Sequence, residues 1–171
     1  NKKQDITFFL RKVVRNMRRF VNPGNTAFEV AVNSQIYVDK TGLLAYTNSV
    51  INTKQALICS SRPRRFGKSI TADMLCAYYS RGCDSDSIFA SYEIAKSDSY
   101  KKYLNQYDVI YLDIQWCMMD AGSAEQTVSY LNYHVIEELK EIYPQILLDG
   151  IRTAYGAMSC INAQTGVKFI V

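Results

Sequence analysis

Apolar residues recur at intervals of three and four over several parts of the chain, and this spacing predicts amphipathic helices. In residues 5–20 the apolar positions share one helical face, while lysines and arginines take the other. Ser123 and Gln126 form a capping box before another apolar stripe, and Pro144 is expected to stop that helix. Further helices are predicted from Asp39 or Thr41 to about Ile51, from Lys68 to about Gly82, in short pieces within 83–107, and across 146–163.

Short apolar runs lie between these helical stretches and predict β-strands. The run "DVIYLDI" at 108–114 is almost continuously apolar, as expected for a strand in a sheet that helices cover on both faces. Other runs predict strands at 35–38, 55–60 and 167–171. Strands that alternate with helices indicate an α/β domain with a mainly parallel sheet flanked by helices.

The turn sequence "NPGN" at 22–25 is a domain boundary, because proline fixes φ and glycine accepts a positive φ. We therefore expect a basic amphipathic helix over residues 1–21 and one α/β domain over residues 22–171. Residues 1–20 hold seven basic side chains and a single acidic one, Asp5. Such a helix can dock on the domain with its basic face solvated, lie on an anionic membrane surface, or contact nucleic acid.

The composition is that of an ordinary soluble globular protein. Hydrophobic residues make up 48% of the chain and charged residues 21%, and the net charge of +4 is mild. No apolar run in the sequence approaches the roughly 18 residues that a membrane span needs. The five cysteines are odd in number and include no C-x-x-C pair, so they indicate neither a zinc site nor a disulfide framework. We therefore expect a cytoplasmic protein.

The stretch "SRPRRFGKSI" at 61–70 carries the strongest chemical signal. It ends like the Walker A phosphate-binding loop, G-x-x-x-x-G-K-[ST], with an arginine in place of the first glycine. In such a loop, backbone N–H groups and a helix N-terminus cradle phosphate oxygens, the lysine reaches the β- and γ-phosphates, and the hydroxyl binds Mg²⁺. We therefore predict ATP and Mg²⁺ as cofactors, Lys68 as the catalytic residue, and a nucleotide site made of Arg62, Pro63, Arg64, Arg65, Phe66, Gly67, Lys68, Ser69 and Ile70.

Five segments of the chain together resemble a predicted AAA-ATPase-like family of bacteria, whose members often carry a PD-(D/E)XK nuclease-like domain further along. The segments are "NPGN", "YVDKTGLL", "SRPRRFGKSITADML", "IFASYEIAK" and "YDVIYLDI", within a resemblance that runs from about Met17 to Val171. In this family the loop reads R-P-R-R-F-G-K-[ST], so Arg62 matches the family's own version of it. The resemblance implies that Lys68 holds the phosphates and Ser69 the metal. It gives no role to residues 37–41, which we expect to form a strand-to-helix junction, with a contact to nucleotide as the alternative.

The carboxylate that would complete the metal site has two candidates. Asp113 closes the apolar run "VIYLD", as a Mg²⁺-binding acid at the end of a buried strand does, and Ser69 and Asp113 are the predicted metal ligands. A structural or switch role for Asp113 is the alternative. The resemblance instead implies an Asp-Glu pair after the strand that matches "VKFIV", beyond Val171. We therefore expect the front part of a P-loop NTPase-like domain, truncated at its C-terminal end, that binds ATP and hydrolyses little of it.

Three functions are consistent with these features. The first is an ATP-binding regulatory module of an ATPase, with a nuclease-like effector domain as partner. The second is a small-molecule or nucleoside kinase, for which Arg81 and Arg152 are available as lid arginines. The third is a non-enzymatic scaffold that binds nucleic acid or another phosphate-bearing partner, with binding that weakens steeply with salt.

Overall fold

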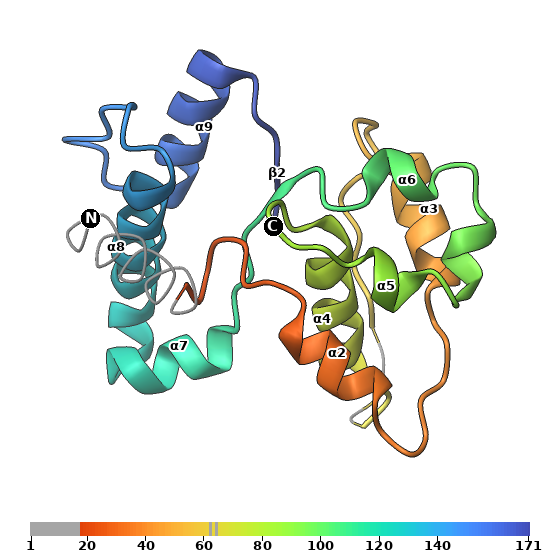
Figure 1. Ribbon diagram of the computed structural model, residues 1–171. Helices are drawn as coiled ribbons and strands as arrows, with labels where there is room; N and C mark the ends of the chain where they lie inside the picture. The colour runs from red at the N-terminus through yellow and green to blue at the C-terminus, as the bar shows by residue number, and fades with distance from the viewer. Residues whose placement is uncertain (1–17, 62, 64) are drawn as a thin grey trace, which may run out of the picture. The chain divides into compact units, whose positions relative to one another are not determined.

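The computed structural model describes residues 18–61, 63 and 65–171 (Figure 1). The chain divides into two compact units, residues 24–107 and residues 108–171 together with the described residues 18–23. We call the first the loop unit and the second the sheet unit. Most of the basic helix predicted for residues 1–21 lies outside the described residues, and residues 18–21 are not helical.

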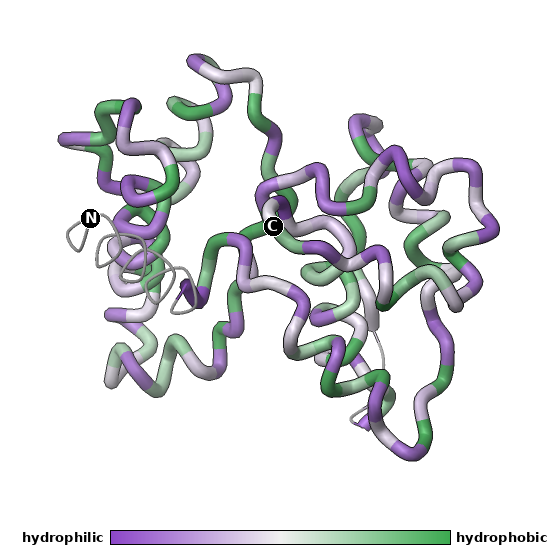
Figure 2. The backbone as a smooth tube through the Cα atoms, in the orientation of Figure 1, coloured by the Kyte–Doolittle hydropathy of each residue, from purple (hydrophilic) through white to green (hydrophobic). Residues whose placement is uncertain are grey.

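The loop unit is built from helices, with α4 carrying its two largest fully buried side chains, Tyr78 and Tyr79. Hydrophobic and hydrophilic residues alternate along these helices (Figure 2), and the hydrophobic side of α4 buries Met74, Ala77, Tyr78 and Tyr79. Helix α2 packs against α4, and η1 contacts both α3 and α6. The elements are α2 (Thr26–Val32), α3 (Gly42–Val50), α4 (Lys68–Tyr79), α5 (Asp86–Phe89), the 3₁₀ helix η1 (Glu93–Lys96) and α6 (Tyr100–Tyr103).

Aromatic rings form the centre of the loop unit. The ring of Phe89 lies 5.1 Å from that of Phe28 and 5.4 Å from that of Tyr78, between centroids. The hydroxyl groups of Tyr78 and Tyr79 are buried, and Asn48 serves both: its Nδ2 donates to the Tyr78 hydroxyl (3.0 Å), and its Oδ1 accepts from the Tyr79 hydroxyl (2.7 Å). These bonds matter because a buried polar group without a partner destabilises the fold.

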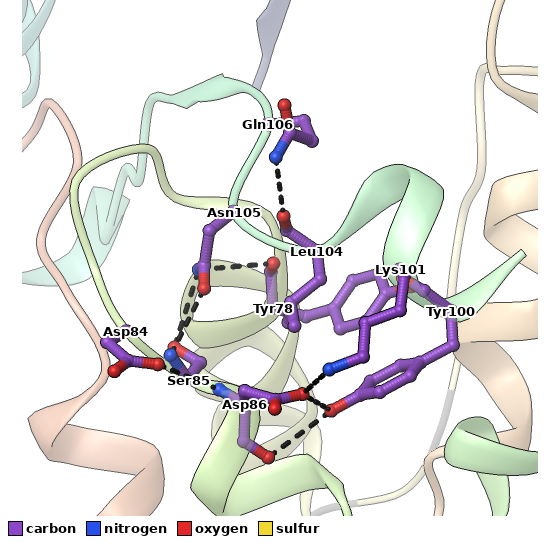
Figure 3. Close-up of polar contacts among 9 residues, drawn as sticks. All are labelled: Tyr78, Asp84, Ser85, Asp86, Tyr100, Lys101, Leu104, Asn105 and Gln106. Carbon is purple, nitrogen blue, oxygen red and sulfur yellow. Dashed lines mark hydrogen bonds and ion pairs between the residues drawn. The ribbon is translucent and has the colours of Figure 1, made fainter.

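The C-terminal end of α4 is closed by Asn105 rather than by the predicted Gly82. The Asn105 Nδ2 donates to the carbonyls of Ala77 (3.0 Å) and Ser80 (2.9 Å), groups that the helix itself leaves unpaired. Its Oδ1 accepts from the amide of Ser85 (3.1 Å), so the same side chain also holds the following loop (Figure 3). Nearby, the carboxylate of Asp86 accepts bonds from Tyr100 and Lys101 (Figure 3).

The sheet unit joins a short parallel β-ribbon to three helices. Strand β1 (Asp108–Val109) pairs in parallel with β2 (Phe169–Ile170), and Val21 forms an antiparallel bridge with Ile110. Helix α7 (Ile114–Ala121) packs on α8 (Ala124–Ile142), and α8 packs on α9 (Ala154–Thr165). The core is made of Phe20, Val21, Ile110, Cys117, Val135, Ile136, Leu139, Tyr143, Ile146, Leu148, Ala157 and Ile161.

The helix predictions that rested on capping residues are confirmed. The Ser123 hydroxyl accepts from the Gln126 amide at 3.3 Å, and α8 ends just before Pro144. Helices α3 and α4 lie where the apolar spacing placed them. The last helix is shorter than predicted, because Thr153 caps it and residues 146–153 form turns. Helices α2 and α7 were not predicted.

Two of the predicted strands are wrong, and the other two, at 108–114 and 167–171, are shorter than predicted. Residues 35–38 and 55–60 are not in strands, and the side chains of Ile36 and Leu57 are 86% and 96% exposed. A strand forms only where a second strand supplies hydrogen-bond partners, and these segments pair with none in the described part of the chain. In the run 108–114, the strand ends at Val109, Ile110 forms an isolated bridge, and Asp113 caps a helix. The α/β class and parallel pairing hold, in a sheet of two short strands.

Within the described ranges, none of the helices combines the length and the apolar character that crossing a membrane requires.

Candidate phosphate-binding loop

The turn that leads into α4 has the backbone geometry of an anion-binding nest. Gly67 lies in the left-handed region, with φ 75° and ψ 28°, and Lys68 then begins the right-handed helix. Two successive residues of opposite hand turn their neighbouring N–H groups toward one side. The N–H groups from Gly67 to Ser69 are therefore arranged to converge. A glycine is favoured at this φ because a side chain there is strained.

The electrostatics of this helix end also suit an anion. Helix α4 has 12 residues, no acidic side chain in its first turn and, among the described residues, no side chain that caps it. Its N-terminus therefore presents the positive end of the helix dipole. Lys68 and Ser69 are exposed, as a group that meets a ligand from solvent must be.

The remaining predicted site residues flank this turn. Pro63, Arg65 and Phe66 are exposed, and Arg65 also has a positive φ of 67°. Ile70, in the first turn of α4, is 40% exposed. Arg62 and Arg64 lie outside the described residues. The loop and helix of the predicted strand–loop–helix order are therefore present, whereas the strand before them is not.

Lys40 reaches this loop from the segment "YVDKT", and it was not among the predicted site residues. Its Nζ donates a hydrogen bond to the carbonyl oxygen of Phe66 at 3.0 Å. A Cβ added to Gly67 would lie 2.9 Å from the same Nζ, closer than real Cβ contacts. The sequence singled out residues 37–41, but nothing in it showed which part of the chain they approach.

The neighbours of Lys40 fix the backbone from which it extends. The carboxylate of Asp39 accepts from the amides of Thr41 (2.7 Å) and Glu93 (2.9 Å). Partial burial tends to raise the pKa of Asp39, but these backbone hydrogen bonds outweigh it and hold the pKa below its ordinary value. Thr41 is fully buried, and its hydroxyl accepts from the amide of Ile94 at 3.2 Å.

Tyr37 anchors the other end of this segment. Its ring meets those of Phe28 and Tyr92 edge-on, with centroids 5.9 and 5.4 Å away. Burial is the main reason that its pKa is raised to about 12. Residues 37–41 therefore form a fixed junction before α3, as predicted, although no strand precedes it.

Asp113, the second predicted metal ligand, belongs to the sheet unit. Its Oδ1 accepts from the amide of Trp116 at 2.9 Å, so it caps the N-terminus of α7. Its assignment as a metal ligand stays a prediction. Among the residues that the structure describes, no three His, Cys, Asp or Glu side chains gather as metal ligands. A Mg²⁺ ion held by Ser69 and phosphate oxygens needs no such group.

Arg81, one of the two arginines considered for a kinase lid, donates from its Nη2 to the carbonyl of Gln106 at 3.0 Å. Arg152 lies in the sheet unit, beside the open surface between α8 and the start of α9. These contacts give no specific support to the kinase hypothesis.

Comparison with known proteins gives one match. No curated protein and no solved structure is similar enough to the chain to count as one. The sequence model of the family described as "Predicted AAA-ATPase" matches residues 24–163, which is most of the 171-residue chain. A match of this extent shows the family. The chain is a member of the predicted AAA-ATPase family.

Proposed function

We propose that this chain is an ATP-binding module of an AAA-ATPase-like protein, and that its phosphate site is the turn from Phe66 to Ile70. The observation that carries the proposal is the change of backbone hand between Gly67 and Lys68, at the exposed start of α4. This geometry supports binding of a polyphosphate by three converging amides and a helix N-terminus. Family membership supports ATP as the nucleotide.

Each residue of the turn has a proposed role. The Lys68 ammonium neutralises the β- and γ-phosphate oxygens, and the Ser69 hydroxyl binds Mg²⁺. The arginines of the loop, Arg65 among them, add charge that can hold phosphate oxygens bidentately. In the loop unit this proposal names no acid that would activate water. We therefore propose binding as the activity of the chain, with slow hydrolysis and a regulatory role toward an attached effector.

Titration with a fluorescent ATP analogue, with and without Mg²⁺, tests this proposal. We expect Lys68→Ala to weaken binding at least tenfold, and Ser69→Ala to remove most of the Mg²⁺ dependence. Lys102→Ala is the matched control, since Lys102 is an exposed lysine of the same unit and lies on α6. Equal affinity of the wild type, Lys68→Ala and Lys102→Ala would show that the turn binds no nucleotide.

A competition experiment separates this function from a nucleic-acid scaffold. ATP should displace the analogue fully, while single-stranded RNA should compete weakly and lose its effect as salt rises. Displacement by RNA at physiological salt, with little effect of ATP, would support the scaffold instead.

A further inference from the structure

The ATP-binding turn does not account for the segment "YVDKT", which is anchored on both sides and ends in a lysine that reaches the loop. We propose that Lys40 is a second lysine of the phosphate-binding loop, a positioning residue that orients the peptide between Phe66 and Gly67. This inference rests on the proposed function, since the orientation of that peptide matters for binding only if the loop holds phosphate.

The hydrogen bond from Lys40 sets the direction of one amide. Its Nζ holds the Phe66 carbonyl oxygen at 3.0 Å. A peptide unit is planar, and in its trans form the C=O and the following N–H point in opposite directions. Fixing the Phe66 carbonyl toward Lys40 therefore turns the Gly67 N–H away from Lys40. That N–H is the first of the three that converge in the nest.

Gly67 makes this contact possible. The ammonium of Lys40 occupies space that a side chain at position 67 would need, since an added Cβ would lie 2.9 Å from it. The φ of 75° is the reason that position 67 favours glycine. The Lys40 ammonium ends a flexible side chain and can move, so we expect an alanine at position 67 to push it off the Phe66 carbonyl.

Lys40 extends from a backbone segment that is held in place on both sides. Lys40 stands between Asp39, whose carboxylate holds two amides, and Thr41, which is fully buried. The exposed side chain of Lys40 extends from this segment to the loop. The lysine thus ties an exposed loop to the packed part of the loop unit, across 26 residues of sequence.

Two measurements on Lys40→Met and Lys40→Arg test the inference, with Lys102→Met as control. Methionine keeps an unbranched side chain, one heavy atom shorter, and loses the donor, while arginine keeps a donor. Lys40→Met should weaken binding of the ATP analogue roughly tenfold, as the loss of a charged hydrogen bond does, and Lys40→Arg should recover most of that loss. In the nucleotide-free protein, amide hydrogen exchange in residues 65–71 should be faster in Lys40→Met, at an unchanged melting temperature.

These measurements distinguish the proposed role of Lys40 from the proposed function of the chain. If Lys68→Ala abolishes binding while Lys40→Met binds like the wild type, the role of Lys40 is wrong and the proposed function stands. If the wild type binds no nucleotide, the proposed function fails. Hydrogen exchange then still decides whether Lys40 holds the loop, and unchanged exchange in Lys40→Met overturns that as well.

A double-mutant cycle tests the link between Lys40 and Gly67. Gly67→Ala should weaken binding both by strain at a positive φ and by displacing Lys40. In the Lys40→Met background only the strain remains, so Gly67→Ala should cost a smaller factor there than in the wild type. Equal factors in the two backgrounds would show that position 67 and Lys40 act independently.

Discussion

The carboxylate of Glu138 accepts a hydrogen bond from the amide of Val21, with 2.7 Å between nitrogen and oxygen. The same carboxylate accepts from the amides of Arg19 (2.9 Å) and Phe20 (3.1 Å). One side chain of α8 thus satisfies three consecutive backbone N–H groups, in a part of the sheet unit where Phe20 and Val21 enter the core.

Replacing Glu138 should therefore destabilise the sheet unit. We expect Glu138→Ala to lower the free energy of unfolding by about 3 kcal/mol, because charged hydrogen bonds to buried amides are lost. Glu138→Gln keeps one acceptor oxygen and should cost about half as much. Urea denaturation followed by circular dichroism measures both. Glu141 is an exposed glutamate on the same helix, and Glu141→Ala serves as control. If Glu141→Ala lowers the free energy of unfolding as much as Glu138→Ala does, the lost hydrogen bonds to the amides are not the cause.

Cysteine labelling tests the finding that residues 55–60 are exposed. Cys59 is exposed, whereas Cys76 and Cys117 are buried. Burial raises the pKa of both buried thiols, that of Cys76 to about 12, so they hold little thiolate at pH 8. Iodoacetamide should modify Cys59 at least about a hundredfold faster than Cys76 in the native protein, by peptide mass spectrometry. Slow modification of Cys59, like that of Cys76, would instead support the buried strand predicted at 55–60.

The stability of the junction at Asp39 should depend on pH. Its pKa in the folded protein lies below the ordinary value, so its contribution is complete above the unfolded pKa of about 3.9 and is lost as pH falls through the folded pKa. Asp39→Asn should therefore be less stable than the wild type at pH 7, and the two should converge in acid. Urea denaturation between pH 2.5 and 7 checks this, with the exposed Asp98→Asn as control. A constant difference across that range would contradict it.

Substitutions of Asp113 separate its cap from the predicted metal role. Asp113→Ala should cost about 1 kcal/mol by removing the acceptor for the Trp116 amide, while Asp113→Ser keeps an acceptor and should retain most of the stability. Thermal denaturation distinguishes the two. Because serine removes the carboxylate, a loss of Mg²⁺-dependent nucleotide binding in Asp113→Ser, at normal stability, would identify Asp113 as a metal ligand. Unchanged binding would leave it a helix cap.

Local signals in the sequence predicted helices α3, α4 and α8, but not α2 and α7. Ser123 with Gln126 marked the start of α8, and the glycine before Lys68 marked the start of α4, because caps and backbone hand depend on neighbouring residues. Strands were predicted less well, since the apolar run at 55–60 looks like a strand but needs a partner that the sequence does not reveal. The runs at 108–114 and 167–171 did form strands, because they pair with each other, over two residues.

The candidate site shows the same division between local and distant information. The residues from Phe66 to Ser69 match a known loop pattern in the sequence, and the turn at Gly67 leads into a helix, as predicted. Lys40 was missed because its contact with Phe66 spans 26 residues. Asp113 was ambiguous because an acid that follows an apolar run can cap a helix or bind a metal, and the residue type is the same for both.

The closure of α4 by Asn105 bears on how a ligand would meet its opposite end. The helix is about 18 Å long, at 1.5 Å for each of its 12 residues, and it is locked by packing along its second half. Its first turn is therefore held in place before any anion arrives. Association would then spend little free energy on immobilising the receiving amides, which is the thermodynamic advantage of a preorganised seat.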